Sequence, residues 1–321
     1  GYSGVAESEL VVSQEIDFPT KYAARSKQAQ MQQTVGDQLL AKQRRDILLQ
    51  AQLVCIDVIR LNLSLAMLRE RLSNSETLLQ MYEKRMEAGD ANALELNKVK
   101  IDCMEVRTLV GEAEGERTAL LQQLQQLNGG KSIDVSSTEL PHYEPIVDFE
   151  HYRALAVASD ADVAVAQTAL RAADMNLKVQ KSEWLPNISF GYRRNTEQRE
   201  AINGFMVGVS FPLYSNSSNV KAARERRQSA ELQVQQAQHD AEASLRTSYE
   251  QLQGLQQVID HSDVKLLQES LTLFRKALQQ GEITALAYYV EINSIYEKLQ
   301  RHIDLHSQSV KLLAELHRNE L

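Results

Sequence analysis

The side chains best suited to bind a metal ion or to catalyse a reaction are scattered along this 321-residue chain. His302 and His306 have the i, i+4 spacing that places two ligands on one helical face, but no His-Glu-x-x-His motif accompanies them. No phosphate loop, nucleotide fingerprint or nucleophile elbow is present. The sequence therefore predicts no catalytic residue, no metal site and no cofactor, and it argues against an enzyme. The seven histidines stand at positions 142, 151, 239, 261, 302, 306 and 317.

Methionine and cysteine are the remaining ligand types. Met81, Met86 and Met104 surround a predicted turn and are candidate soft-metal ligands, although packing at a helix crossing is the better interpretation. Cys55 and Cys103 lack the spacing of a metal or redox motif and are expected to be buried small apolar residues. In a helical hairpin their levels differ by about 30 Å at 1.5 Å per residue, which excludes an intrachain disulfide.

Composition and proline placement limit the fold that must hold these residues. The formal net charge of -8 argues against a nucleic-acid partner. No run of about twenty apolar residues exists, so no transmembrane helix is expected. The five prolines stand at 19, 141, 145, 186 and 212, and the stretches 20–140 and 213–321 are rich in helix-forming residues. The sequence predicts two very long helical regions.

The two helical regions belong to an internal repeat. The segment MYEKRMEAGDANALEL (81–96) lies over LFRKALQQGEITALAY (273–288) without a gap, so that Gly89 falls on Gly281. Ala-Ala-Arg follows a proline-marked apolar segment at 23–25 and again at 222–224. Each repeat reads as a strand, a long helix, a glycine break and a second helix. Glycine suits the left-handed residue that ends a helix, and Asp90 or Asn92 can cap the next one.

The repeat predicts the domain organisation. The first repeat covers 1–128, with a helix of about 100 Å from 20 to 88 at 1.5 Å per residue and a return helix over 93–128. An equatorial linker follows at 129–149. The second repeat covers 150–321, with helices over 150–184 and 219–280, a hairpin at 186–213, a turn near 281 and a return helix. By analogy, forty or more residues are expected to precede Gly1.

Three segments alternate in the manner of strands: 10–18, 186–194 and 205–211. Alternation over about ten residues is typical of transmembrane strands, although a half-buried sheet in a soluble protein gives the same pattern. Three strands cannot close a sheet, so several chains would have to pool their hairpins into one barrel. The polar segment 194–203 would then be an external loop. The predicted membrane-facing residues are Ile188, Phe190, Tyr192, Phe205, Val207, Val209 and Phe211.

The order SEWLPNISFGY, VGVSFPLYS, a long Ala-rich helix and RKALQQGEITALAYYVEINSIY resembles the TolC-like outer membrane efflux proteins over essentially the whole chain. The family's Tyr-x-x-Arg-x-x-x-Gly run stands here as Tyr82, Arg85 and Gly89. In the second repeat the arginine position is Ala277. The resemblance implies a mainly α protein of long antiparallel helical hairpins, whose short β-hairpins contribute to a shared trimeric barrel.

The resemblance also implies a function and its partners. The chain would be a passive channel subunit in the outer membrane of a Gram-negative bacterium, with a helical extension in the periplasm. Its partners would be two further copies, outer membrane lipid, a periplasmic adaptor and an inner-membrane pump, for which the resistance-nodulation-division type is the candidate. The turns would meet the adaptor through Gly89, Asp90, Asn92, Leu94, Gly281, Glu282, Thr284 and Leu286, or these residues only cap and staple the turns. The candidate gate residues are Glu95, Glu282 and Glu291, or each of these carboxylates lies on an ordinary solvated helix face.

A non-enzymatic coiled-coil scaffold or a periplasmic adaptor is the alternative function. An adaptor should carry a Gly-rich and β-branched lipoyl-like or barrel domain between its helical arms, and none is found here. A plain scaffold would not need alternating strands at matching places in both repeats. The sequence does not indicate whether drugs, metal ions or peptides are transported.

Overall fold

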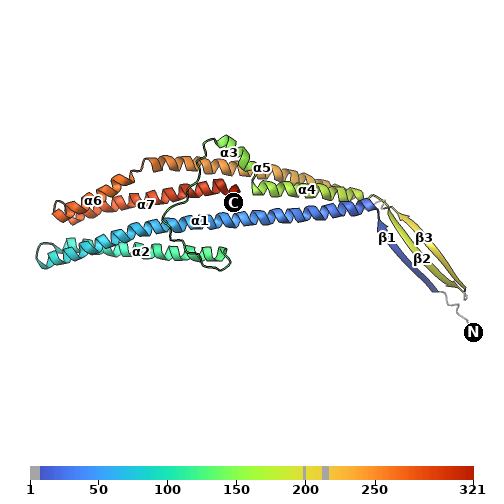
Figure 1. The fold of residues 1–321 in the computed structure, drawn as a ribbon, viewed down its shortest axis with the longest axis horizontal. Helices are drawn as coiled ribbons and strands as arrows, with labels where there is room; N and C mark the ends of the chain where they lie inside the picture. The colour runs from blue at the N-terminus through green and yellow to red at the C-terminus, as the bar shows by residue number, and fades with distance from the viewer. Residues whose placement is uncertain (1–7, 198–199, 212–216) are drawn as a thin grey trace, which may run out of the picture. The chain divides into compact units, whose positions relative to one another are not determined.

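The structure is a computed structural model that describes residues 8–197, 200–211 and 217–321 (Figure 1). It confirms the mainly α fold with a small three-stranded sheet. In chain order the elements are β1 (Ser8–Asp17), α1 (Pro19–Glu87), α2 (Ala93–Leu127), α3 (Phe149–Ala158), α4 (Ala161–Ser182), β2 (Asn187–Glu197), β3 (Glu200–Ser210), α5 (Ser217–Asp260), α6 (Val264–Gln280), α7 (Ala285–Leu316) and a 3-10 turn (His317–Glu320).

Helix α1 begins at Pro19, where the fixed backbone angle of proline suits the first helical position and the missing N–H costs nothing. It continues for 69 residues because no proline interrupts it. Contrary to our expectation, α1 contains an 18-residue window of mean hydropathy 1.6 that is long and apolar enough to cross a membrane. This is weak evidence for a membrane span, because 44% of the stretch is buried and the core helices of soluble proteins can be equally long and apolar.

Two predicted helices are each broken in the structure. The helix expected over 150–184 divides into α3 and α4, because Asp160 accepts hydrogen bonds from the backbone N–H groups of Asp162 and Val163. The helix expected over 219–280 divides into α5 and α6, where Asp263 accepts from the N–H of Leu266 at 2.9 Å. In both cases an aspartate starts a new helix by satisfying its first free donors.

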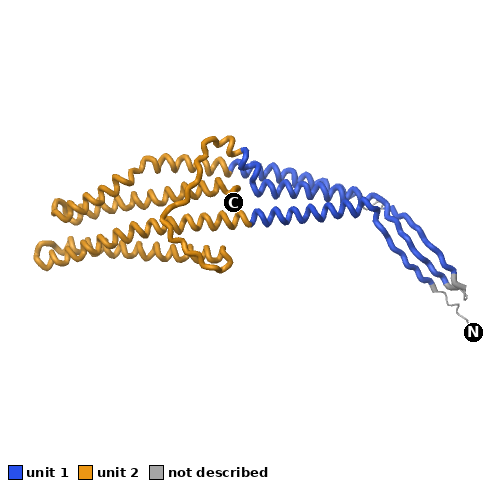
Figure 2. Tube along the Cα trace, viewed as in Figure 1, with its two compact units in different colours: residues 1–43, 154–243 blue, residues 44–153, 244–321 orange. Residues whose placement is uncertain are grey.

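The chain divides into two compact units (Figure 2). Unit 1 comprises residues 1–43 and 154–243 and includes the sheet. Unit 2 comprises residues 44–153 and 244–321 and includes the α1–α2 and α6–α7 turns. Each unit takes one part from each predicted repeat, so the division into repeats at 1–128, 129–149 and 150–321 stays a prediction.

The core of unit 2 is a series of small clusters between helices. Leu61, Leu65 and Leu68 of α1 pack with Ala113 of α2. Farther along, Val54 and Val58 pack with Leu124, and Ile56 packs with Val310 and Ala314 of α7. The apolar positions of α1 therefore serve both the first hairpin and α7.

The sheet is antiparallel in the order β1–β2–β3. Its hairpin is longer than expected, because Arg194 pairs with Asn203 and the ladder continues to Glu197 and Glu200. Most of the predicted loop at 194–203 is therefore strand. The prediction was wrong because a strand is recognised from the alternation of apolar residues, which this polar segment lacks. Cross-strand hydrogen bonds nevertheless extend the ladder into the polar segment. Residues 198–199, and 212–213 of the predicted hairpin, lie outside the described residues.

Candidate functional site

The two faces of the sheet differ sharply in polarity. Residues that pair directly share a face, so Ile188 lies with Val209, Phe190 with Val207 and Tyr192 with Phe205. On β1 the register adds Leu10, Val12 and Ile16 to this face, with Gln14 among them. Most of these apolar side chains are exposed, to 71% for Val207 and 90% for Phe205. The structure thus gathers six of the seven predicted membrane-facing residues on one side of the sheet, and Phe211 directly follows β3 with 61% of its surface exposed.

The opposite face carries mostly small, polar or charged side chains. Glu15, Ser189 and Gly208 form one row, and Ser13 and Gly191 lie in the row beside it. A Cβ added at Gly208 would lie 2.6 Å from Ser189 Oγ, and one at Gly191 would lie 3.2 Å from the carbonyl oxygen of Val12. The sheet therefore has two different faces: one is mostly apolar, and the other combines small and charged side chains with the exposed Val11, Met206 and Ile202.

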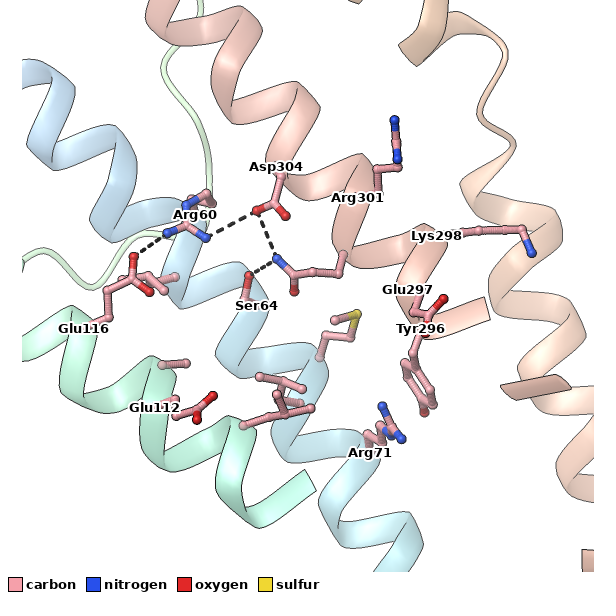
Figure 3. A pocket seen from close by; sticks show the side chains of 16 residues that line it. Arg60, Ser64, Arg71, Glu112, Glu116, Tyr296, Glu297, Lys298, Arg301 and Asp304 are labelled. Atoms are coloured by element: carbon pink, nitrogen blue, oxygen red, sulfur yellow. Dashed lines mark hydrogen bonds and ion pairs between the residues drawn. The ribbon is translucent and has the colours of Figure 1, made fainter. Parts of the chain in front are cut away.

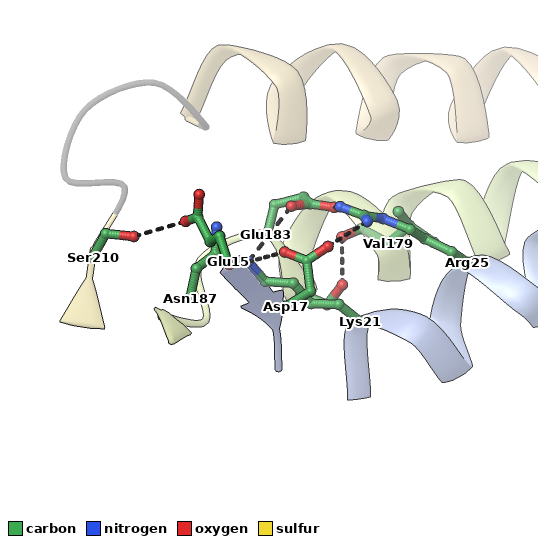
Figure 4. A network of polar contacts seen from close by, with 9 residues as sticks. Glu15, Asp17, Lys21, Arg25, Val179, Glu183, Asn187 and Ser210 are labelled. Atoms are coloured by element: carbon green, nitrogen blue, oxygen red, sulfur yellow. Dashed lines mark hydrogen bonds and ion pairs between the residues drawn. The ribbon is translucent and has the colours of Figure 1, made fainter. Parts of the chain in front are cut away.

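A buried cation holds the strands to the helices of unit 1 (Figure 4). Lys21, in the first turn of α1, is 1% exposed, and its Nζ donates to Asn187 Oδ1 at 2.5 Å. Carboxylate oxygens of Asp17 and Glu183 lie 3.6 and 3.7 Å from the same Nζ. Arg25 donates to both carboxylates, at 2.6 Å to Asp17 and 2.7 Å to Glu183. The network joins the β1–α1 junction to the α4–β2 junction.

The two predicted turns lie at the same end of unit 2 and have the same backbone structure (Figure 1). Gly89 and Gly281 have φ of 79° and 74°. After each glycine the next N–H, of Asp90 or Glu282, donates to the carbonyl four residues before the glycine, at 2.8 and 2.9 Å. The glycine N–H donates to the carbonyl three residues before it, at 3.1 Å in both turns. This is the Schellman motif, and it confirms the predicted helix-ending role of both glycines.

The polar side chains of the turns act first as caps. Asn92 Oδ1 accepts from the N–H of Glu95 at 2.9 Å, and Glu95 reaches back to the N–H of Asn92, so Asn92 and not Asp90 starts α2. Thr284 Oγ1 accepts from the N–H of Ala287 and starts α7. Leu94 and Leu286 occupy matching positions after these caps and are 74% and 58% exposed. Each turn thus leaves one leucine exposed to the solution.

The three predicted gate carboxylates are divided between the two turns. Glu282 and Glu291 are exposed on the α6–α7 hairpin, whereas Glu95 is half-buried in the capping box of α2. Any channel role of Glu95 is therefore combined with a structural one.

A tyrosine-rich core holds the two turns together. Tyr82 of α1 and Val99 of α2 pack with Leu278 of α6 and with Tyr288 and Tyr289 of α7. Burial raises the pKa of Tyr288 to about 12 and raises the pKa of Tyr289 as well. The hydroxyl of Tyr289 is buried without a hydrogen-bond partner. These tyrosines stay neutral and serve as packing groups.

A buried ion pair lies deeper in the same hairpins and was not predicted from the sequence. Arg71 Nη2 donates to Asp102 Oδ1 and to Asn293 Oδ1, both at 2.8 Å, and Asp102 is fully buried. Ser75 donates to the other oxygen of Asp102 at 2.5 Å, and the guanidinium lies 4.8 Å from the ring centre of Tyr296. The network joins α1, α2 and α7.

Next to this ion pair, α1, α2 and α7 line an open pocket of about 680 Å³ (Figure 3). Arg60 bridges Glu116 and Asp304 across it, at 2.7 and 3.3 Å. Ser64 Oγ accepts from the amide of Gln300, which cannot act as a base, so the cavity does not present an activated nucleophile. Charged side chains of both signs line it in equal number: Arg60, Arg71, Lys298 and Arg301 with Glu112, Glu116, Glu297 and Asp304.

The candidate metal ligands do not form a site. His302 and His306 lie on one face of α7 with ring centres 6.0 Å apart, and His302 Nδ1 is 3.1 Å from Ser262 Oγ. Within residues 8–197, 200–211 and 217–321, no group of three or more His, Cys, Asp or Glu side chains is placed to hold a metal ion. Cys103 is buried, Cys55 is half-buried, and both are free thiols.

Comparison with known proteins decides what this arrangement is. The outer membrane efflux protein family matches residues 153–318, just over half of the chain. The chain belongs to the outer membrane efflux protein family. This efflux protein is a channel subunit of the outer membrane of Gram-negative bacteria, with its helices in the periplasm. No curated protein matches it at the level of sequence.

Solved structures agree in fold with the efflux protein. A membrane protein from Pseudomonas aeruginosa superposes with a TM-score of 0.80 at 16% identity, over 98% of this chain and 80% of that one. VceC of Vibrio cholerae gives 0.75 at 15% identity, over 98% and 87%. CusC gives 0.74 at 19% identity, over 98% and 77%. These likenesses extend across both units.

The turn glycines permit a direct test of the structure of the two turns. Changing Gly89 or Gly281 to alanine should lower the stability of the efflux protein by about 1–2 kcal/mol each, because both glycines are left-handed. The matched controls are Gly36→Ala and Gly111→Ala, in exposed helix interiors with free space around the added methyl. These should raise stability by about 0.5–1 kcal/mol. Denaturant titration followed by circular dichroism measures both effects, and equal effects at all four sites would contradict the turn structure.

The buried ion pair gives a second prediction. Asp102→Asn should destabilise unit 2 by about 3–5 kcal/mol, because it leaves the Arg71 guanidinium buried without its counter-charge. The double variant Arg71→Met with Asp102→Asn should recover much of that loss. Glu114→Gln is the control, since it breaks the exposed Arg69–Glu114 pair between the same helices and should cost at most about 1 kcal/mol. Denaturant midpoints check the series, and a double variant no better than Asp102→Asn would refute the coupling.

Proposed function

We propose that this efflux protein is a passive, non-enzymatic conduit that works as a trimer, docked to a periplasmic adaptor and an inner-membrane pump. The structure of the sheet is the main observation in support of this proposal. One face is mostly apolar and exposed, the other carries mostly small, polar or charged side chains, and β1 and β3 each have one unpaired edge among the described residues. Such a sheet is completed in lipid when copies pair their edges into a closed barrel, because unpaired backbone groups cost several kcal/mol each in hydrocarbon.

The helical turns are the proposed adaptor-binding tips. In each turn the glycine and the cap residue fix the backbone and leave a leucine exposed, Leu94 in one and Leu286 in the other. An acidic residue, Asp90 or Glu282, stands beside each glycine and is exposed. An adaptor surface with an apolar pocket and basic rim fits this pattern. The remaining predicted contacts, Asn92 and Thr284, support these residues through their caps.

The proposed gate consists of Glu95, Glu282 and Glu291. Repeated by threefold symmetry, these carboxylates would surround the mouth of the conduit and favour cations. Glu282 and Glu291 are exposed, so their charge is available to the solution.

Purification of the protein with its native N terminus in detergent tests the conduit directly. We expect the mass of a trimer, and discrete openings in a planar bilayer with a preference for cations. Replacing the three gate residues by glutamine should lower the cation-to-anion permeability ratio, measured from reversal potentials. The change Glu95→Gln should leave the cap of α2 in place, because glutamine also serves in a capping box.

The control for selectivity is Glu105→Gln, an exposed carboxylate farther along α2, which should leave the permeability ratio unchanged. A water-soluble monomer or dimer without bilayer activity would overturn the conduit and favour a coiled-coil scaffold.

Adaptor docking has its own test. Leu94→Asp and Leu286→Asp together should weaken binding to the periplasmic adaptor of the same bacterium at least tenfold, the effect of losing about 1.4 kcal/mol of contact energy. Trimer mass and single-channel conductance should stay as in the parent protein. Leu155→Asp, at a similarly exposed leucine of α3, is the control and should not change binding. Surface-plasmon measurements with the trimer immobilised decide the matter, and equal binding by all variants would exclude the tips.

A further inference from the structure

The pocket between α1, α2 and α7 has an apolar lining that belongs to the folded core (Figure 3). Leu61 and Leu68 are buried in the first hairpin, so this part of the lining is fixed by the packing of α1 on α2. The volume of about 680 Å³ suits a small organic molecule, since ligand pockets usually measure about 300–1,000 Å³. The apolar lining residues are Leu61, Met67 and Leu68 of α1, Leu109 and Ala113 of α2, and Tyr296 of α7.

Most charged side chains of the pocket stand at its rim. Those that are exposed are Glu112, Glu297, Lys298 and Arg301. They contribute two charges of each sign, and water screens them. Arg60 is half-buried, and its guanidinium is already paired with Glu116 and Asp304. Among the 16 described residues that line the pocket, only Arg71 is both charged and buried.

The guanidinium of Arg71 has more donors than acceptors. Its side chain is 8% exposed, and its hydrogen bonds to Asp102 and Asn293 both come from the same nitrogen, Nη2. Nε is buried without a hydrogen-bond partner, and Nη1 donates to none of the described residues. The counter-charge, Asp102, does not line the pocket. Unused N–H groups on a buried arginine are suited to bind a carboxylate.

The pocket is ordered along its length. The guanidinium of Arg71 lies 4.8 Å from the ring centre of Tyr296, and Figure 3 shows these two side chains close together, with Arg60 and Asp304 at the other end. Arg60 and Arg71 are 11 residues apart on α1, or about 16 Å at 1.5 Å per residue. The apolar residues of α1 stand between them in the sequence. A molecule with an anionic group at Arg71 and an apolar body along α1 matches this order.

We propose that the pocket binds a small amphipathic carboxylate. Its carboxylate accepts hydrogen bonds from Arg71, and its apolar body packs on Leu68, Leu109 and Tyr296. The site lies within unit 2 of a single chain, so it does not rest on the proposed channel function. Because the ligand contacts α1, α2 and α7 together, its binding stabilises the packing of the two hairpins.

Phenylbutyrate is the probe for this site. The protein with its native N terminus, purified in detergent, is titrated with phenylbutyrate, phenylbutanol and phenylbutylamine, which share one apolar body and differ in the charge of the head group. Isothermal titration calorimetry gives the three dissociation constants. We expect phenylbutyrate to bind at least about tenfold more tightly than the other two, because only its head group combines acceptor oxygens with a negative charge. Equal affinities, or no binding of phenylbutyrate up to its solubility, would overturn the site.

A double variant tests the role of Arg71. Arg71→Met with Asp102→Asn removes the guanidinium together with its counter-charge, so no buried charge is left unpaired. It should weaken phenylbutyrate binding at least about tenfold and change phenylbutanol binding by less than about twofold. Arg69→Met, at an exposed arginine of the same helix, is the matched control and should leave all three affinities unchanged. Undiminished phenylbutyrate binding by the double variant would exclude Arg71 as the anion-binding group.

A second variant tests the pocket itself. Leu109→Trp fills the apolar lining from α2 and should weaken the binding of both phenylbutyrate and phenylbutanol. Circular dichroism establishes that each variant is folded. If the double variant does not fold, Leu109→Trp still decides the matter. Phenylbutyrate binding that this variant does not weaken takes place in the detergent or on another surface, and the proposed site is then refuted.

Discussion

The unpaired edges of the sheet are the constraint on which the rest of the molecule depends. Among the described residues, the three-stranded antiparallel sheet has free N–H and C=O groups along one edge of β1 and one edge of β3. Water can satisfy these groups, but hydrocarbon cannot, and the exposed apolar face indicates hydrocarbon. Closure with strands of other copies satisfies both demands at once. It also explains why the chain enters the sheet twice. Each time, a strand leads into a long helix, and that helix needs a second helix to pack beside it.

The transition from strand to helix is fixed by charge. A slip of two residues would keep the apolar side chains of a strand on the same face, whereas a buried ammonium group tolerates few positions. Lys21 is 1% exposed, and its three partners Asn187, Asp17 and Glu183 come from both junctions. Leaving such a charge without partners costs several kcal/mol, so the network selects the register in which Asp17 pairs with Asn187. It thereby aligns β1 with β2 and α1 with α4 through one group.

What the sequence could predict depended on how local the signal is. Gly89 and Gly281 end helices through their own backbone freedom, so their role was visible in the sequence, whereas Asp90 and Asn92 were both candidate caps and the structure uses Asn92. The break at Asp160 was missed because an aspartate inside a helical pattern only becomes a cap when its side chain turns back to the backbone. The Arg71–Asp102 pair joins residues 31 apart on two helices, and only the packed hairpin brings them together. The polar end of the β2–β3 hairpin likewise depends on a partner strand.

At the turns, the same few residues fix the backbone and leave the proposed recognition surface exposed. In each turn a polar side chain, Asn92 or Thr284, accepts a hydrogen bond from a backbone N–H of the following helix. The tyrosine core then packs the two hairpins against each other. What remains for a partner is the apolar side chain two residues after each cap and the carboxylate beside each glycine. Leu94 and Leu286 are exposed because the cap fixes the start of each helix and directs that position away from the core. The proposed recognition at the tips would therefore depend on capping, and both tips present the same local geometry.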